Sequence, residues 1–408
     1  MQIRPILATL KHHKAGTLLI AMQIALTLAI VCNAMFIIRQ RVAHLSQPSG
    51  VDEANVLVVH NEWAGKPPPG EIASLMAADV ATLRMLPGVA DAYATNSYPL
   101  GGSGTAYGIG HSPDKLKYVS TTAVYFVDEQ ALPTLGLKLV AGRNFRPDEI
   151  GQVDNHANIQ PGAIILTRTL ADVLFPDGSA LGKTAYISSQ PSTIVGIVER
   201  METPWVGSGA AQYAGRSTLI PYRRLTDSTV YVVRARPGQL EDVRRHVRAA
   251  LYAANRMRVI SPKDGVRTFA EVRAEAYKSD RGMAILMGII SVMLLVITAA
   301  GIVGLSSFWV GQRRKQIGVR RALGATRHDI LSYFLTENLL IGVAGVLVGS
   351  VLALGLNLWL MKQFETARIA PGYVVVGAVV LLVLGQGAVL APALRASRVP
   401  PVVATRSV

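Results

Sequence analysis

The stretch Gly178-Ser-Ala-Leu-Gly182-Lys183-Thr184 comes nearest in this sequence to a site for chemistry, because it resembles a phosphate-binding loop. It is one residue shorter than the G-x-x-x-x-G-K-[ST] pattern. A phosphate-binding loop also opens a helix, so that backbone N–H groups face the phosphates. Here the next residues (TAYIS) are typical of a strand. We therefore expect no phosphate site.

Other catalytic patterns are also incomplete. Gly102-Ser103-Gly104 and Gly207-Ser208-Gly209 lack the G-x-S-x-G spacing of a nucleophile turn and are typical of flexible loops. The eight histidines are scattered, with no H-E-x-x-H motif. The single cysteine, Cys32, lies in an apolar run and excludes an intrachain disulfide. We expect no catalytic residue, metal site or cofactor in this chain.

A basic segment between two apolar runs has the clearest local signals. Residues 312–330 read QRRKQIGVRRALGATRHDI. Gly324 is suited to follow a helix C-terminus, and Thr326 with Asp329 forms a capping-box pattern that starts another helix. The sequence therefore predicts two helices joined by a sharp turn, an elbow at residues 311–329.

Apolar stretches on both sides of the elbow, and one near the N-terminus, predict four transmembrane helices. Residues 17–38 carry no charge over 22 positions, and about 20 apolar residues suffice to cross a bilayer. A signal peptide would have a shorter apolar region and an A-x-A-like cleavage site. A lipoprotein signal fails because Val31 precedes Cys32. The other predicted spans are 283–310, 330–361 and 373–394.

The net charge of +15 and pI near 10.1 reflect where the cations lie along the chain. Residues 1–15, 311–329 and 395–408 together hold twelve cations and one acid, whereas residues 39–281 hold 27 cations and 23 acids. This distribution follows the positive-inside rule and argues against nucleic-acid binding. It predicts a cytoplasmic N-terminal segment (1–16), elbow and tail (395–408), with residues 39–281 and 362–372 outside.

The long segment between the first two spans predicts an α+β domain over residues 39–266. Strand–helix–strand patterns at about 55–95 and 229–261 flank a β-rich insertion at about 96–228. Residues 267–282 (RTFAEVRAEAYKSDRG) are charged, and we expect a helical stalk that runs directly into the second span. The predicted fold is a membrane protein of four transmembrane α-helices with this domain inserted between helices 1 and 2.

The third span carries a face of small residues and one acid. Gly345, Gly349 and Ala353 recur every four residues, a pattern that lets helix backbones approach closely, either within one bundle or between two chains. Glu337 begins the span beside Asn338. We do not expect an ion relay, because no second acid occurs in any predicted span.

The elbow also carries a family resemblance. RRKQIGVRRALGATRHDIL resembles the R-x-x-E-I-G-I-R-R-A-L-G-A signature of FtsX/MacB-type ABC transporter permeases, with Gln316 at the position of the usual Glu. The tail PALRASRVPPVVATR is similar to the closing motif of that family. LKLVAGRNF and ALGKTAYISSQPSTIVGIV resemble parts of the MacB-like periplasmic core domain.

The resemblance implies that the elbow is a coupling helix seated in a groove of a cytoplasmic ABC ATPase. Carried over by motif position, the contact residues are Arg313, Gln316, Ile317, Gly318, Arg320, Arg321, Ala322, Leu323, Gly324 and Ala325. The chain has no Walker A, no Walker B-like strand and no LSGGQ motif. ATP and Mg²⁺ are therefore expected in a partner subunit, and this chain is not expected to be an enzyme.

The resemblance further implies mechanotransmission from two ATPase copies to the periplasmic domain, in a bacterial inner membrane. The leading hypothesis is a MacB-like efflux permease that pairs with a second permease chain, identical or different, and acts with a periplasmic adaptor and an outer-membrane duct. Lipoprotein release as in LolC/LolE and regulation of cell-wall hydrolases as in FtsX remain alternatives. A membrane-anchored periplasmic sensor or enzyme is the alternative of another class. Membrane lipid is expected around the spans.

Overall fold

The computed structural model describes residues 14–114, 117–154, 159–178, 180–187, 189–364 and 368–400. The predicted N-terminal segment before residue 14, the tail after residue 400 and positions 365–367 of the predicted outer loop lie outside the described residues. The chain forms two compact units. We call residues up to Leu45 with those from Asp280 the helical unit, and Ser46–Ser279 the α+β unit.

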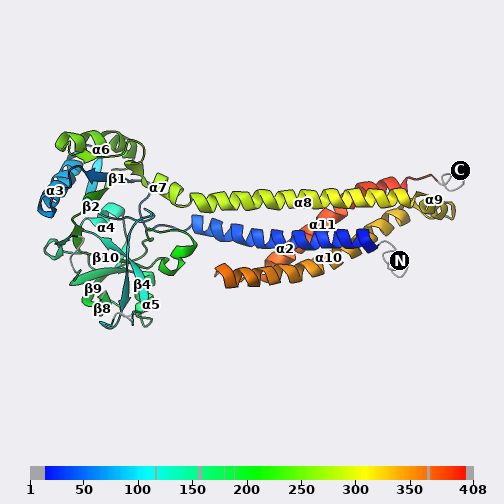
Figure 1. Cartoon of the computed structure of the whole chain (residues 1–408), viewed down its shortest axis with the longest axis horizontal. Coiled ribbons are helices and arrows are strands. Elements are labelled where there is room, and N and C mark those ends of the chain that lie inside the picture. The colour runs from blue at the N-terminus through cyan, green and yellow to red at the C-terminus, as the bar shows by residue number, and fades with distance from the viewer. Residues whose placement is uncertain are drawn as a thin grey trace. The chain divides into compact units, whose positions relative to one another are not determined.

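The helical unit contains four helices that are long and apolar enough to span a membrane, which confirms the four predicted spans. They are α2 (Lys14–Leu45), α8 (Lys278–Gln312), α10 (Arg327–Phe364) and α11 (Pro371–Ser397). A short helix, α9 (Arg314–Ala322), joins α8 to α10 and lies at one end of the bundle (Figure 1).

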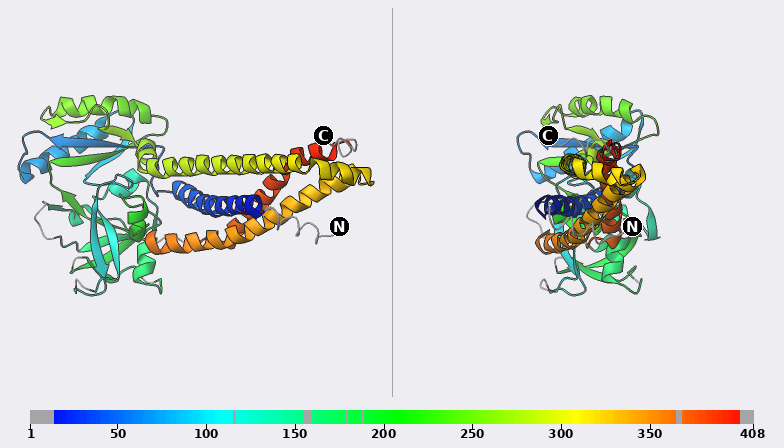
Figure 2. Two further views of the ribbon diagram at one scale, coloured as in Figure 1. Left: turned by 45° about the vertical axis from the view of Figure 1, so that its right-hand side comes forward. Right: turned by 90° about the vertical axis from the view of Figure 1, so that its right-hand side faces the viewer.

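Helix α2 forms the centre of the bundle core. Its residues Ile20, Ile24, Leu28 and Cys32 recur every four positions and are almost completely buried. Such spacing places them on one face of the helix. In both Figure 1 and Figure 2, α2 runs beside α8 and α10. Apolar side chains on the outer faces of α8, α10 and α11 are exposed, as suits helices that face lipid.

The α+β unit contains a first sheet in the strand order β13-β1-β12-β2, with β14 paired to β1. Neighbouring strands on this path are antiparallel. The two strands of each expected strand–helix–strand segment are therefore not neighbours. Strand β12 lies between β1 and β2, and β1 lies between β13 and β12. The elements are β1 (Val56–Trp63), α3 (Pro69–Met85), β2 (Val89–Thr95), β12 (Ser228–Ala235), α6 (Leu240–Ala254), β13 (Arg258–Val259) and β14 (Val266–Thr268).

Helices α3 and α6 pack against this sheet and against each other. Helix α6 buries Val243, Val247 and Leu251, spaced by four residues, and exposes its charged side. On β1, Leu57 and Val59 point to the same core because side chains alternate along a strand. The sheet and the two helices thus enclose one apolar core.

The insertion between β2 and β12 folds into a second sheet, of order β5-β9-β7-β10-β4-β3-β8. Because β8 also pairs with β9, the sheet closes on itself. Its elements are β3 (Thr105–Gly110), β4 (Ser120–Phe126), α4 (Ala131–Leu135), β5 (Leu139–Gly142), β7 (Ala163–Thr167), α5 (Arg168–Leu174), β8 (Thr184–Ile187), β9 (Gln190–Val198) and β10 (Ser217–Ile220). A separate ribbon pairs β6 (Gly151–Val153) with β11 (Tyr222–Arg224), and short 3-10 helices cover Pro147–Glu149 and Ser208–Tyr213.

The predicted stalk differs from expectation, because it is not one continuous helix. Residues 267–268 belong to strand β14, and α7 (Phe269–Ala276) begins at a capping box formed by Thr268 and Glu271. Helix α7 ends at Tyr277, whose φ of −97° and ψ of 8° interrupt the helix before α8. The Tyr277 side chain is buried, and the Arg273 guanidinium lies over its ring. The interruption thus coincides with a buried side chain, at a position that carries no Gly or Pro signal.

Candidate functional site

The phosphate-loop-like stretch forms a turn that leads into a strand. Thr184 begins β8, and the Gly182 N–H donates to the Ile194 carbonyl rather than facing a cavity. Lys183 pairs with Asp177 at 3.2 Å and lies over the Phe175 ring. This geometry gives a phosphate neither a helix N-terminus nor an uncommitted lysine, so we place the functional site elsewhere.

The elbow has the local structure that its sequence predicts. Helix α9 ends at Ala322, and Gly324 follows with a φ of +101°, a conformation that residues with a Cβ rarely adopt. The Thr326 hydroxyl accepts from the Asp329 N–H at 3.2 Å, and the Asp329 carboxylate accepts from the Thr326 N–H at 2.9 Å. Both the predicted helix end and the predicted capping box are confirmed.

Arg313 is the single non-helical residue between α8 and α9, with a φ of −92° and ψ of 8°. Its side chain turns inward, where Nη1 donates to Glu337 Oε1 at 3.0 Å and Oε2 at 2.9 Å. Both side chains are buried, with exposed fractions of 8% for Arg313 and 3% for Glu337. This buried ion pair ties the start of α9 to α10.

Three more contacts hold α9 against its own chain. Ile317 is buried in a cluster with Ile330 and Phe334 of α10. The Arg320 guanidinium lies 5.0 Å from the centre of the Tyr333 ring, a distance typical of cation–π attraction. Arg321 Nη1 donates to the Val399 carbonyl at 2.7 Å. Helix α9 is therefore fastened along its length to α10 and to the residues that follow α11.

The opposite side of α9 is open. Arg314, Lys315 and Gln316 are exposed. Leu323 is 83% exposed, and Val319 is 47% exposed. The helix contains four cations and no acid. This face combines apolar side chains with positive charge, which suits an apolar groove rimmed by carboxylates.

The ten residues predicted to contact a partner therefore separate into two sets. Arg313, Ile317 and Gly318 are buried against the rest of the bundle. The side chains of Arg313 and Ile317 position the elbow from the inside. The seven that remain at least partly exposed are Gln316, Arg320, Arg321, Ala322, Leu323, Gly324 and Ala325.

The small-residue face of α10 packs against α2 of the same chain. A Cβ added to Gly345 would lie 2.8 Å from the Ala21 carbonyl oxygen, and one added to Gly349 would lie 2.8 Å from Ala25 Cα. Ala353 is fully buried, and its carbonyl accepts from Asn33 Nδ2 at 3.1 Å. Of the two alternatives left open by the sequence, the structure has the contact within one bundle.

Helix α8 is attached to α2 by polar contacts spaced along its length. Thr27 and Thr298 share a hydrogen bond of 2.7 Å, and Gln23 donates to the Ile297 carbonyl at 3.1 Å. Near the other end of α8, Arg41 pairs with Asp280. Because side-chain hydrogen bonds between helices have few competitors in lipid, these contacts link the two helices at defined positions.

Glu337 is the site residue that sequence reasoning undervalued. The sequence argues only against a role for Glu337 in an ion relay, and the family motif places its partner Arg313 at a contact with another protein. The available signal was the pairing itself, since a buried or intramembrane charge requires a counter-charge. Arg313 and Glu337 are 24 positions apart, so only the packing of α9 on α10 identifies them as partners.

Residues 18–250 match the family model of the MacB-like periplasmic core domain, and residues 288–401 match that of the FtsX-like permease C-terminal domain. The chain is 25% identical over 364 residues to the macrolide export ATP-binding/permease protein MacB 1/2 of Paracoccus denitrificans (strain Pd 1222), covering 87% of this chain and 51% of that protein. It is 25% identical over 309 residues to the uncharacterized ABC transporter permease YvrN of Bacillus subtilis (strain 168), covering 73% of each.

Among solved structures, the periplasmic region of MacB from Actinobacillus actinomycetemcomitans matches 57% of this chain and 97% of its own, with a TM-score of 0.35 and 13% identity. The chain spans about a third to a half of the length of the MacB relatives it matches, 33% in one and 51% in another.

Proposed function

We propose that this chain, which belongs to the family of FtsX-like permeases with a MacB-like periplasmic core domain, is the permease subunit of a mechanotransmitting ABC transporter. A cytoplasmic ATPase would bind ATP and Mg²⁺ and hydrolyse the ATP. Nucleotide-driven closure of two ATPase copies would move two elbows, one on this chain and one on a second permease chain, identical or different.

The observation that carries the proposal is the two-sided construction of α9. Its inner side is fixed by the Arg313–Glu337 pair and the burial of Ile317, while its outer side exposes Leu323. A force applied to the outer side therefore moves α9 as part of the bundle. Since α9 follows α8 after one residue, and α8 is hydrogen-bonded to α2, the displacement would reach two spans that continue toward the α+β unit.

The distribution of charge supports an orientation for this device. The cations of the elbow lie between α8 and α10, as expected for a cytoplasmic loop. We place both termini and the elbow in the cytoplasm, and the α+β unit in the periplasm of a bacterium with an inner membrane. Because the MacB relatives are named for macrolide export, we propose efflux of a periplasmic substrate, with a periplasmic adaptor and an outer-membrane duct.

The proposal is tested by placing a photo-crosslinking amino acid at position 323 of the full-length chain in its native membranes. We expect cross-linking to a protein that carries a Walker A motif. Met85, which is 84% exposed on α3 of the α+β unit, supplies the control position. Cross-linking of the same ATPase from both positions, or from position 85 alone, contradicts the proposal.

A functional variant completes the test. Burial of a leucine side chain stabilises an interface by about 1.5–3 kcal/mol, so Leu323→Asp is expected to weaken association with the ATPase by about tenfold or more. Met85→Asp, a change of the same chemistry at equal exposure, should leave association unchanged. An unchanged affinity in Leu323→Asp would falsify the assignment of this face.

A further inference from the structure

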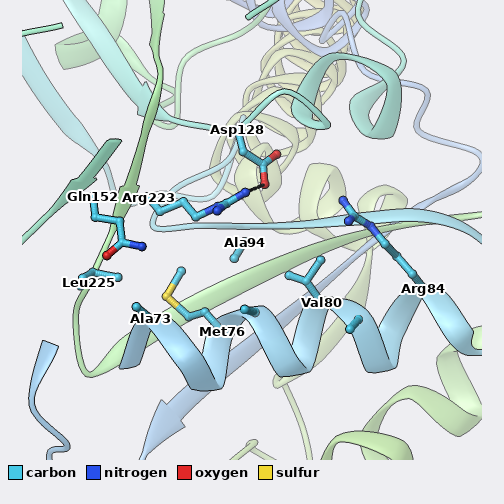
Figure 3. Close-up of a pocket in the computed structure, with 11 residues that line it drawn as sticks. Ala73, Met76, Val80, Arg84, Ala94, Asp128, Gln152, Arg223 and Leu225 are labelled. Atoms are coloured by element: carbon cyan, nitrogen blue, oxygen red, sulfur yellow. Dashed lines mark hydrogen bonds and ion pairs between the residues drawn. The ribbon is translucent and has the colours of Figure 1, made fainter. Parts of the chain in front are cut away.

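A cavity of ≈ 210 Å³ lies inside the α+β unit, between helix α3, which packs on the first sheet, and residues of the insertion. One wall is α3, and Ala94 of β2 lines the base. Across from them are Asp128 after β4, Gln152 of β6, and Arg223 of β11 (Figure 3). Cavities between two substructures are common places for small-molecule binding.

The α3 wall is apolar and combines three alanines with Met76 and Val80. Ala73, Ala77, Ala81 and Arg84 recur at three- and four-residue spacing and form one face of the helix. A different face, with Ile72, Asp79 and Leu83, is buried on the sheet. Met76 belongs to both faces and Ala73 packs against the core, whereas Ala77 and Ala81 are exposed, so the space above these two alanines is open.

Two guanidinium groups border this apolar wall. Figure 3 shows Arg223 extending to Asp128 above α3, and Arg84 rising from the end of α3 toward the same side. Arg84 Nε donates to Asp91 Oδ1 at 2.8 Å, and Arg223 Nη2 donates to Asp128 Oδ2 at 3.3 Å. Arg223 Nη2 also lies 3.9 Å from Glu129 Oε2, so this guanidinium faces two carboxylates. Within the described residues, the Nη groups of Arg84 have no hydrogen-bond partner.

Both carboxylate oxygens of Asp128 already accept hydrogen bonds from the protein. Asp128 is only 3% exposed, and its Oδ1 accepts from the Gln130 N–H at 3.0 Å while Oδ2 accepts from Arg223. Burial raises the pKa of this carboxyl group. Its main effect at the cavity is to hold the Arg223 guanidinium in place. The donors left to meet a ligand are chiefly the Nη groups of Arg84, because Arg223 already faces Asp128 and Glu129.

The size of the cavity limits the ligand. Drug-sized ligands occupy about 300–1,000 Å³, so a macrolide does not fit into ≈ 210 Å³. Guanidinium groups recognise carboxylates in preference to neutral acceptors because they offer several N–H donors in one plane. The cavity thus combines a compact apolar wall with guanidinium donors at its border.

We propose that this cavity is a binding site for a small amphipathic carboxylate, with the carboxylate at Arg84 and the apolar body against the alanine face of α3. The site is distinct from the elbow and does not depend on an ATPase. It gives the α+β unit a ligand of its own, smaller than a macrolide.

The test uses the full-length chain in lipid nanodiscs with 4-fluorophenylacetate as the probe, followed by ¹⁹F NMR. The neutral amide 4-fluorophenylacetamide has nearly the same shape and serves as the matched probe. We expect saturable binding of the acid, and binding of the amide weaker by about tenfold, since charge-assisted hydrogen bonds are worth about 1.5–3 kcal/mol. Equal binding of the two probes, or no saturable signal from the acid up to about 10 mM, overturns the proposal.

Two neighbouring alanines supply the control for location. Ala77 and Ala78 are both exposed on α3, but only Ala77 lines the cavity. Ala77→Phe fills the cavity and is expected to abolish binding of the acid, whereas Ala78→Phe should bind it as the wild type does. Arg84→Gln should weaken binding of the acid by about tenfold and leave binding of the amide unchanged. Wild-type binding by Ala77→Phe, or loss of binding in Ala78→Phe alone, refutes the site.

Discussion

The Arg313–Glu337 pair provides the sharpest test of how the elbow is held. Both side chains are buried, with exposed fractions of 8% and 3%, and a single Arg313 nitrogen contacts both carboxylate oxygens. Removing one member of a buried pair leaves an uncompensated charge and typically costs about 3–5 kcal/mol. Arg313→Leu should therefore destabilise the attachment of α9 to α10 by about this amount.

The expected readout is hydrogen exchange of the α9 amides, measured on the full chain in nanodiscs. If the cost falls on local opening of α9, exchange should accelerate by about two to three and a half orders of magnitude, since each 1.4 kcal/mol is tenfold. Arg314→Leu is the matched control, because Arg314 is the next residue and is exposed. In Arg314→Leu the α9 amides should exchange at nearly the wild-type rate.

The double variant Arg313→Leu/Glu337→Leu separates the ion pair from simple packing. Apolar replacement of both members of a buried pair is often neutral or stabilising, so the double variant should recover most of the protection that Arg313→Leu loses. The reasoning fails if Arg313→Leu and Arg314→Leu exchange alike. It also fails if the double variant is as unprotected as the single one.

Three further outcomes can be measured. Gly349→Ala should destabilise the helical unit by about 1–3 kcal/mol, because its Cβ would lie 2.8 Å from Ala25 Cα. Gly355→Ala on the same helix meets open space and should be neutral or stabilising by up to about 1 kcal/mol. Thermal unfolding in nanodiscs compares the two variants, and equal losses of stability contradict the packing. Hydrogen bonds from the Arg143 guanidinium lower the pKa of Glu149 from 4.5 to about 2, so this pair stabilises the fold above about pH 4.5 and the contribution is lost as pH falls toward 2. Glu149→Gln should flatten the pH dependence of the urea midpoint in that window, while the exposed Glu71→Gln should not. Thr326→Ala removes the cap of α10, which costs about 0.5–2 kcal/mol, and should speed exchange of the Asp329 amide; an unchanged rate shows that the capping box does not hold the elbow.

Local signals in the sequence were sufficient for the spans and the elbow. Apolar length predicts the four long helices, because crossing a bilayer requires a minimum number of apolar residues. Gly324 and the Thr326–Asp329 box predict the turn, because both act within four residues of the chain. The α+β class of the inserted domain was also accessible from alternating strand and helix patterns.

Contacts between distant residues were not accessible in the same way. The interruption at Tyr277 coincides with a buried side chain and carries no helix-breaking residue. The closure of the second sheet depends on β8 pairing with both β3 and β9. The cavity near Arg84 forms only when α3 and the loop after β11 meet. In each case the cause is tertiary packing, which leaves no periodic pattern in the sequence.

Gln316 shows how one such local choice bears on the proposed partner. The family signature usually has Glu at this position, four residues before Arg320, and a Glu followed four positions later by a cation forms a favourable pair on a helix surface. In this chain both Gln316 and Arg320 line a small hollow with Tyr333, and Arg320 lies over the Tyr333 ring. No residue of α9 neutralises its four cations. A groove that receives this elbow must therefore supply its own carboxylates, so an ATPase that pairs with a Glu-bearing elbow would meet one more uncompensated positive charge here and bind it less well.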